Sequence, residues 1–368
     1  MSFFSGLFKN KTVSALGIDI GTSSIKVVQL QKKGDKAVLE TYGELSLGPY
    51  GNVAIGQSTN LPTSKIVQAM NDLISEKEVA ITTKVCGMAI PFKASLLSII
   101  TVPEVGEKEM VSMVNIEARK HIPVPISEVT IDWSIIPSRE PEEPVIFKSD
   151  KKAKMVDVLL VAIHNNIIKQ YKEIINRTGL TAKFFEIEIF SSIRAILEGV
   201  QGPVMVFDMG ASTTKLYIID RGLIYSSYTI NSGSQEITAN IARILNVSFE
   251  EAEVIKRSVG MGVTKEGVDL SEAVSVMASK VFAETNRFLF DFQKKTNQNI
   301  KSIFLTGGGA ALKGFRDFAA QHFKVEVVSG NPFEKVEVPA FLENVLKETG
   351  LEFAVASGAA LRCLQELG

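Results

Sequence analysis

The chain has 368 residues, of which 45% are hydrophobic and 22% charged, a globular composition that excludes wholesale disorder and fibrous repeats. Its 40 basic and 41 acidic residues give a formal charge of -1, which excludes a general electrostatic attraction to nucleic acid. The longest apolar stretch, residues 95–102, falls far short of the roughly 20 residues of a membrane-spanning helix. Because the start of the chain lacks the pattern of a secretory signal, we expect a cytoplasmic protein.

Two segments of the chain resemble each other. Residues 17–30 (GIDIGTSSIKVVQL) align without a gap with residues 206–219 (VFDMGASTTKLYII), so that Asp19 meets Asp208 and Lys26 meets Lys215. Each segment begins with apolar strand-forming residues, tightens at a turn of glycine and hydroxyl residues, and continues as a second strand. This pattern predicts two β-hairpins in two related halves of the chain.

The first half continues with alternating strand and helix signals. Apolar residues at helical spacing predict helices, and runs of β-branched residues predict strands. In chain order, we expect a strand at 37–47, a helix at Thr63–Ser75, strands at 85–91 and 95–103, a helix at Glu107–His121, strands at 130–136 and 156–163, and a helix at Asn165–Thr178.

The second half turns helical after its hairpin and then returns to mixed α/β structure. We expect helices at 236–246, 249–260 and 269–296, a strand at 302–307, a helix at 310–323, a strand at 325–328 and a helix at 353–367.

These elements predict an α/β protein with two lobes, each of which is interrupted by an insertion. The expected parts are a flexible N-terminal tail (1–12), a first-lobe core (13–83 and 183–201), an inserted α/β subdomain (84–182), a second-lobe core (202–233 and 297–368) and a helix-rich subdomain (234–296).

The turns of the two hairpins suit a phosphate chain bound between two lobes. Small residues let backbone N–H groups approach phosphate oxygens closely, and Lys26 adds a positive charge. Asp19 and Asp208 are expected to hold Mg²⁺ through water, because this ion keeps several waters and takes few protein ligands. The alternative is that both are ordinary tight hairpins with Asp at a turn.

Three glycines lie between a predicted strand and a predicted helix in IFLTGGGAALKGF, residues 303–315. Such a turn lets the chain pass close to a flat ligand, and the helix N-terminus favours negative charge. The segment lacks the GxGxxG spacing, which disfavours a dinucleotide site.

The order DxGTSSxK, DxGxSTTK and TGGGAxLxG resembles the actin-like ATPase superfamily, whose members share two phosphate loops and an adenosine motif. The resemblance implies ATP and Mg²⁺ as cofactors and two ribonuclease-H-like lobes. It places Glu253 near the ribose and Lys256 beside the base. The other implied nucleotide ligands are Gly21, Thr22, Ser23, Ser24 and Lys26, then Asp208, Gly210, Ala211, Ser212 and Thr213, then Gly307, Gly308 and Gly309.

The insertion is similar to that of the FtsA and PilM families, and three strings favour PilM: FKNKTVSALGIDIGTSSIKVVQL, EARKHIPVPISEVTIDW and FAVASGAALR. This resemblance implies a component of type IV pilus assembly that docks the N-terminal cytoplasmic peptide of PilN at the inner membrane. The peptide is expected in a groove between the first-lobe core and the insertion. We expect residues 86–90 and Glu107–His121 to line that groove, because both segments carry apolar runs.

The segment FFEIEIFSSIRAI resembles the connection where a water-positioning residue of the superfamily lies. Glu188 is the candidate and Glu186 the second choice, and their alternation with apolar residues predicts that they point the same way from a strand. We expect slow or absent turnover. The alternatives are a filament-forming FtsA-like division protein, a small-molecule kinase of the same superfamily, and a type II secretion component resembling GspL.

Overall fold

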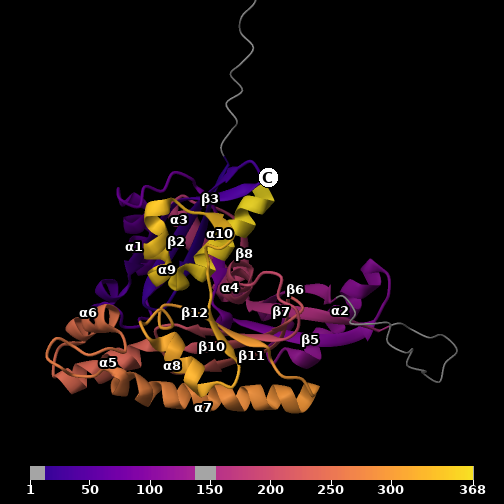
Figure 1. Ribbon diagram of the computed structural model, residues 1–368. Helices are drawn as coiled ribbons and strands as arrows, with labels where there is room; N and C mark the ends of the chain where they lie inside the picture. Colours follow the sequence, from indigo (N-terminus) through magenta and orange to yellow (C-terminus); the bar gives the residue numbers. More distant parts are fainter. Residues whose placement is uncertain (1–12, 137–154, 368) are drawn as a thin grey trace, which may run out of the picture. The chain divides into compact units, whose positions relative to one another are not determined.

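The computed structural model describes residues 13–136 and 155–367, and these residues form two compact units (Figure 1). The larger unit contains the described residues up to Ala89 and from Ile175 onward, and the smaller unit is Ile90–Ile174. The tail predicted at 1–12 lies outside the described residues.

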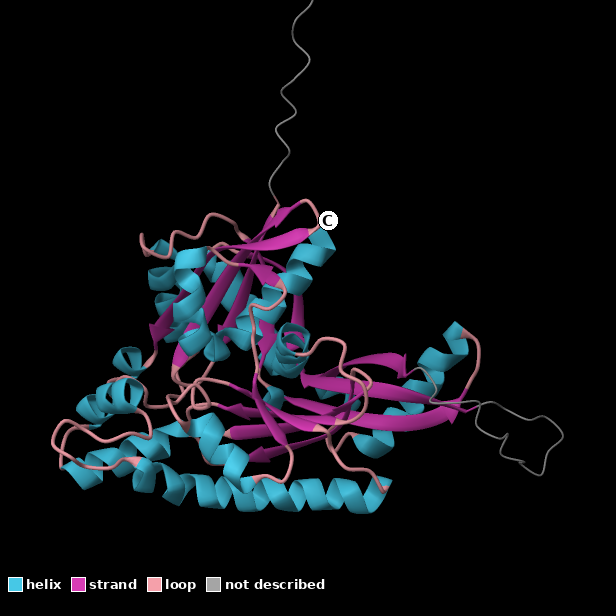
Figure 2. Cartoon of the chain, viewed as in Figure 1, coloured by secondary structure: helices cyan, strands magenta, loops and turns pink. Residues whose placement is uncertain are grey.

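The first sheet of the larger unit has the strand order β14-β3-β2-β1-β4-β8. Strands β1, β2 and β3 form an antiparallel meander, and β4 runs parallel to β1. Helices flank this sheet in Figure 2. The strands are β1 (Ser14–Ile20), β2 (Ser24–Lys33), β3 (Lys36–Ser46), β4 (Val85–Ile90), β8 (Thr181–Ile187) and β14 (Val336–Glu337), and the helices include α1 (Thr63–Ser75), α4 (Glu188–Ile196), α9 (Glu343–Thr349) and α10 (Ala354–Leu367).

The insertion begins later than the predicted boundary at residue 84. Strand β4 pairs with β1, with Leu16 opposite Cys86 and Ile18 opposite Met88, and is therefore part of the first sheet. The continuous apolar sequence of β4 is typical of a strand that is covered on both faces, and it does not indicate a new subdomain.

The end of the chain packs on the first sheet, whereas we expected all of 297–368 in the second lobe. Helix α10 shares a core with residues of β1 and β2, and β14 extends the first sheet beside β3. The approach is close because the facing residues are small. A Cβ atom on Gly17 would collide with the backbone of Ala356, and a Cβ atom on Gly358 with the backbone of Ser191.

The second sheet has the order β11-β10-β9-β12-β13, with β9, β10 and β11 as an antiparallel meander and β12 parallel to β9. Its core includes buried residues of the following helices, among them the fully buried Phe315. The elements are β9 (Val204–Met209), β10 (Thr214–Asp220), β11 (Leu223–Ile230), β12 (Ser302–Thr306), β13 (Glu326–Ser329), α5 (Ser234–Leu245), α6 (Phe249–Val259), α7 (Ser271–Thr296) and α8 (Phe315–His322).

Helix α8 is shorter than the helix predicted over 310–323. It begins at Phe315 because Gly314 precedes it with a φ of 85°, a left-handed conformation that ends any continuation from the glycine turn. Residues 310–314 form turns instead.

The smaller unit is a three-stranded antiparallel sheet in the order β5-β7-β6, with helix α2 packed on one face. Met110, Val114 and Ala118 of α2 are buried against alternate residues of the strands. The elements are β5 (Ser95–Pro103), α2 (Glu107–His121), β6 (Val129–Ile136), β7 (Met155–His164) and α3 (Asn165–Thr178), which continues into the larger unit. The predicted bounds of α1, α2 and α3 are confirmed.

The contact between α10 and α4 gives a test of the packing. We expect Gly358→Ala to lower the free energy of unfolding by about 1–3 kcal/mol, because the added methyl group forces the two helices apart. Urea denaturation measures the change. Gly106→Ala is the control, since a Cβ atom there meets nothing. Equal midpoints for Gly358→Ala and the wild type would contradict the packing.

Candidate functional site

The two predicted hairpins have the same local geometry. In the first, the Gly21 N–H donates to the carbonyl oxygen of Ser24 at 2.9 Å, and in the second the Gly210 N–H donates to that of Thr213 at the same distance. The cross-strand registers also correspond, because Asp19 lies opposite Lys26 and Asp208 opposite Lys215. The repeat in the sequence is therefore a repeat in structure, with an Asp and a Lys at the mouth of each turn.

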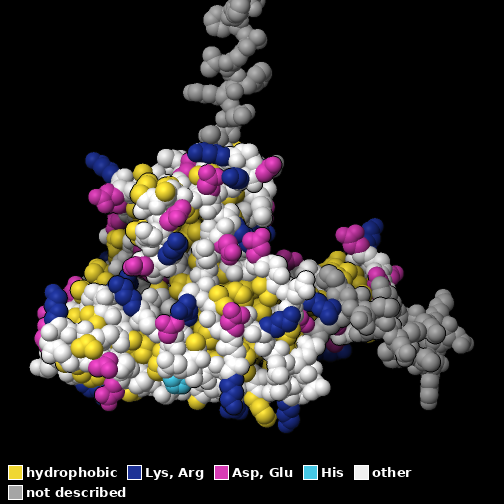
Figure 3. Space-filling model, viewed as in Figure 1, with side chains coloured by type: hydrophobic (Ala, Val, Ile, Leu, Met, Phe, Trp, Pro, Cys, Tyr) yellow, Lys and Arg dark blue, Asp and Glu magenta, His cyan; other side chains and the backbone are white. Residues whose placement is uncertain are grey.

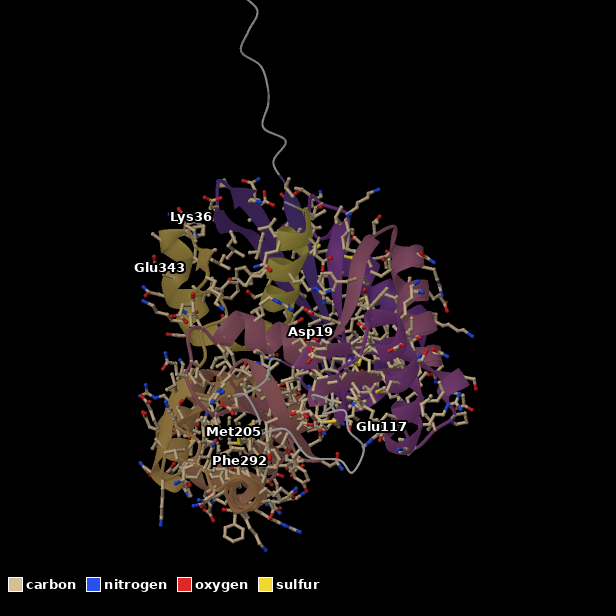
Figure 4. The ribbon with its side chains drawn as sticks, turned by 90° about the vertical axis from the view of Figure 1, so that its right-hand side faces the viewer. Asp19, Lys36, Glu117, Met205, Phe292 and Glu343 are labelled. Atoms are coloured by element: carbon tan, nitrogen blue, oxygen red, sulfur yellow. The ribbon has the colours of Figure 1, made fainter. Side chains whose placement is uncertain are left out.

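The turns of the two hairpins meet. The hydroxyl oxygens of Thr22 and Ser212 lie 3.2 Å apart, within hydrogen-bond distance, although 190 positions separate them in the chain. In Figure 4, Asp19 lies between the part that carries Lys36 and Glu343 and the part that carries Met205 and Phe292. The predicted phosphate loops thus face each other between the two sheets.

Lys215 lies among carboxylates. Its Nζ is 2.7 Å from Oε2 of Glu188 and 3.5 Å from Oδ2 of Asp208. Burial alone would lower the pKa of Lys215, but these two carboxylates outweigh it and raise the pKa well above its usual value. Glu188 is the first residue of α4, so one ion pair joins the start of that helix to the second hairpin.

Lys26 has a corresponding environment at the first hairpin. Its Nζ donates to the Ser24 hydroxyl at 2.6 Å and lies 3.1 Å from Glu44 and 4.0 Å from Glu352. Burial opposes the charge, but Glu44 and Glu352 raise the pKa of Lys26. Both glutamates were missed in the sequence, because each sits in a segment without a motif. Glu44 is the cross-strand neighbour of Lys26 in β2 and β3, which a hairpin register can reveal.

The two aspartates of the hairpins are hard to ionise. Desolvation and the nearby Glu188 carboxylate raise the pKa of Asp19 from 3.8 to about 7. Desolvation also raises the pKa of Asp208, although Lys215 opposes it. A hydrated divalent cation fits this spot, because it would neutralise carboxylates that are otherwise costly to ionise. Within residues 13–136 and 155–367, no group of three or more acidic, His or Cys side chains is placed to hold a bare metal ion.

The glycine turn after β12 packs on the end of β9. A Cβ atom on Gly307 would collide with the carboxylate of Asp208, and one on Gly309 would collide with the side chain of Met209. Gly309 also donates its N–H to the carbonyl oxygen of Met209 at 2.9 Å. Gly308 lies beside Glu352, whose carboxylate would be 3.4 Å from an added Cβ. The structure therefore brings the third predicted segment to the second hairpin.

Glu253 and Lys256, one turn apart on α6, form a buried ion pair. The Lys256 Nζ lies 2.6 Å from Oε2 of Glu253, which also accepts from the Thr238 hydroxyl at 2.7 Å. Arg257 donates to the other oxygen at 2.9 Å, and burial lowers the pKa of Lys256. A Cβ atom on Gly56 would meet the Glu253 carboxylate, so this pair abuts the segment that follows β3.

Glu186 and Glu188 do not point the same way, contrary to the prediction. The carboxylate of Glu186 accepts four hydrogen bonds. Its Oε1 accepts from Ser191 and Arg194, both at 2.6 Å, and its Oε2 accepts from Arg194 at 3.0 Å and from Arg362 at 2.7 Å. With four donors on its two oxygens, Glu186 has no lone pair free for water. The chain turns from β8 into α4 between the two residues, which sends Glu188 to Lys215 instead.

The strand half of the predicted groove is also wrong. Cys86, Met88 and Ile90 are fully buried, and Ala89 nearly so, because β4 is an inner strand of the first sheet. Helix α2 does present a free side. Its Ile116 is 63% exposed, on the side away from the residues that pack on the sheet.

Comparison with known proteins identifies the family of this chain and several of its relatives. The sequence profile of the family described as type IV pilus assembly protein PilM matches residues 17–364. The cell division protein FtsA of Enterococcus hirae is 23% identical over 357 residues, which cover 86% of this chain and 78% of that protein. FtsA of Neisseria meningitidis is 24% identical over 367 residues, covering 88% and 86%.

Solved structures agree with the fold. A chain of the PilM-PilN type IV pilus biogenesis complex superposes with a TM-score of 0.76 and 25% identity, covering 96% of this chain and 99% of that chain. The ethanolamine utilization protein EutJ from Carboxydothermus hydrogenoformans gives a TM-score of 0.52 with 17% identity, covering 95% and 89%. The predicted class, an actin-like ATPase fold with an inserted α/β subdomain, is confirmed. No helix among the described residues is long and apolar enough to cross a bilayer.

The raised pKa of Asp19 gives a test of the site's electrostatics. We expect Asp19→Asn to make the ligand-free protein more stable, with a gain that grows from pH 4 to pH 7 and then levels off. The unfolded carboxyl ionises near the ordinary value of 3.8, whereas the folded one ionises near 7, so the wild type loses stability across this window as pH rises.

Urea denaturation at several pH values measures this gain, with Asp35→Asn, at an exposed turn, as the control. A pH-independent difference, or a less stable Asp19→Asn variant, would show that Asp19 is not held among the other carboxylates.

Proposed function

Because the chain belongs to the PilM family of type IV pilus assembly proteins, we propose that it binds Mg-ATP between its two hairpins and docks the N-terminal peptide of PilN. The observation that carries the nucleotide half is the meeting of two repeated turns, each with an Asp, a Gly, hydroxyl residues and a Lys. The actin-like fold is generally a nucleotide-binding fold with a divalent cation, which supports the same conclusion.

The turns supply the groups that a phosphate chain needs. The β- and γ-phosphates would accept from backbone N–H groups of residues 22–24 and 211–213, where small side chains permit close approach, while the N–H groups of Gly21 and Gly210 close their own turns. Lys26 and Lys215 would bind phosphate oxygens in place of carboxylates. The hydroxyl groups of Thr22 and Ser212, now in contact, would have to separate to admit the phosphates.

Asp19 and Asp208 hold Mg²⁺ through water in this proposal. When bound, the ion neutralises phosphate charge and makes both carboxylates easier to ionise. The two aspartates lie opposite the two lysines in their hairpins, so cation and anion sites alternate across the mouth of each turn.

The nucleoside end lies toward α6 and the glycine turn. Glu253 would bind the ribose and Lys256 would lie beside the base, and Gly307, Gly308 and Gly309 would pass along the adenosine. Since Glu253 and Lys256 neutralise each other, their approach to a nucleoside adds no net charge.

Glu188 is the water-positioning residue of the proposal. In the structure one oxygen of its carboxylate is paired with Lys215 at 2.7 Å, which holds it at the second hairpin. Turnover in this proposal is slow, and ATP acts chiefly as a ligand that changes how the lobes close.

The partner is PilN, which places the protein at the cytoplasmic face of the inner membrane. One structural neighbour is a chain of a PilM-PilN complex, and this supports PilN as partner. The strand residues predicted to bind the peptide are buried. The peptide therefore binds to the exposed side of α2 around Ile116.

A second candidate is an FtsA-like division protein, favoured by the similarity to FtsA proteins. ATP-dependent pelleting of the protein, with binding to a division-ring protein and none to PilN, would select it. Failure of Mg-ATP to sediment the protein would leave the PilN role as the better account.

Removing the charge at the first hairpin tests nucleotide binding. We expect Lys26→Met to weaken Mg-ATP binding at least tenfold, about 1.4 kcal/mol, because a buried cation is lost from the phosphate site. Calorimetry measures the affinity, with Lys36→Met as the control, since Lys36 forms only an exposed ion pair with Glu337. A folded Lys26→Met variant with wild-type affinity would remove Lys26 from the site.

An acidic side chain on α2 tests PilN docking. We expect Ile116→Asp to weaken binding of the PilN N-terminal peptide at least tenfold, about 1.4 kcal/mol, by placing a charge in an apolar contact. Ile244→Asp, the same change at an exposed isoleucine of α5, is the control. If Ile116→Asp binds normally while Ile99→Asp does not, the peptide lies on the other face of the small sheet.

A further inference from the structure

Helix α7 has a free face with a regular pattern. On its inner side, buried residues such as Val274, Met277 and Val281 join the second core. On the opposite side, steps of four and three residues connect six exposed positions, which share one face of a helix. This α7 face consists of Val276, Lys280, Ala283, Arg287, Phe290 and Lys294.

The α7 face combines an apolar line with a basic line. Val276 is 57% and Phe290 63% exposed, with Ala283 midway between them at intervals of seven residues. A cation follows each of the three by one turn. Figure 3 shows basic and hydrophobic side chains projecting together along the edge where Figure 1 draws α7.

The cations of this face are available to a partner. The ion pairs found among the described residues all involve other lysines, arginines or histidines. The neighbouring Glu284 instead accepts from the Tyr228 hydroxyl at 3.0 Å. Lys294, in the last turn, also favours the helix C-terminus, but Lys280 and Arg287 lie mid-helix, where no such benefit exists.

From this pattern we propose that the α7 face docks an acidic amphipathic helix of another protein. An apolar line at seven-residue spacing is what a partner helix packs on, and flanking charges select the sign of its side chains. The 26 residues of α7 offer about 39 Å of length at about 1.5 Å per residue, enough for several turns of a partner.

Two other occupants fit less well. A second copy of the chain, packed through the same face, would bring cations against cations. An anionic membrane calls for a broad face with bulky apolar residues, whereas this line is narrow and has Ala283 at its centre.

The test is photo-crosslinking of the full chain in cells that make it. Phe290 is replaced by the photoreactive residue p-benzoylphenylalanine, and Phe341, which is 80% exposed elsewhere, is replaced in a control protein. We expect Phe290, and not Phe341, to crosslink to a segment of another protein, which mass spectrometry identifies as rich in Asp and Glu with apolar residues at helical spacing.

The triple change Lys280→Glu, Arg287→Glu and Lys294→Glu supplies the second arm. All three residues are exposed, so we expect an unchanged melting temperature and at least a tenfold loss of the Phe290 crosslink. A crosslink to lipid, to another copy of the chain or to a segment without acidic side chains would overturn the proposal. So would the lack of any crosslink, or one that survives the triple change.

Discussion

The candidate site depends on two largely buried lysines, each of which is neutralised by carboxylates. Lys26 is held by Glu44 and Glu352, and Lys215 by Glu188 and Asp208. Burying a charge is costly unless it is paired, so the two lysines depend on these internal counter-ions. A phosphate chain competes with the carboxylates for the same cations, and in the proposed function binding therefore rearranges the residues between the lobes.

This constraint joins distant parts of the chain. Glu44 comes from β3, Glu188 from the start of α4, and Glu352 from the turn before α10. Helix α10 in turn packs on β1 and α4 through Gly17 and Gly358, where the backbones leave no room for a side chain. The carboxylates that pair with the two lysines therefore lie on elements that pack on the first sheet and on α10. A change in the partners of either lysine would act on these elements.

The sequence predicted the hairpins, the glycine turn and most helices because these are local patterns. The two hairpins predicted at residues 17–30 and 206–219 are present, and their cross-strand registers match. Features that depend on tertiary contacts were missed. The inner position of β4 was one, because an apolar strand gives no sign of which sheet it joins. The return of α10 to the first sheet was another.

The partners of ionic groups could not be predicted for the same reason. Glu186 and Glu188 look alike in the sequence, yet the turn into α4 sends one to Arg194 and Arg362 and the other to Lys215. Glu352 has no motif around it and reaches Lys26 only through the fold. Alternation of apolar and charged residues predicts side-chain direction only within a strand, and β8 ends between these two glutamates.

The most direct test of the account is to lock the two hairpins together. Thr22→Cys with Ser212→Cys would place two thiols where hydroxyls now lie 3.2 Å apart, and Cys86 and Cys363 are both buried. We expect calorimetry to show no Mg-ATP binding by the oxidised protein, and binding restored by reduction. Equal affinity in both states would contradict a phosphate site between the turns.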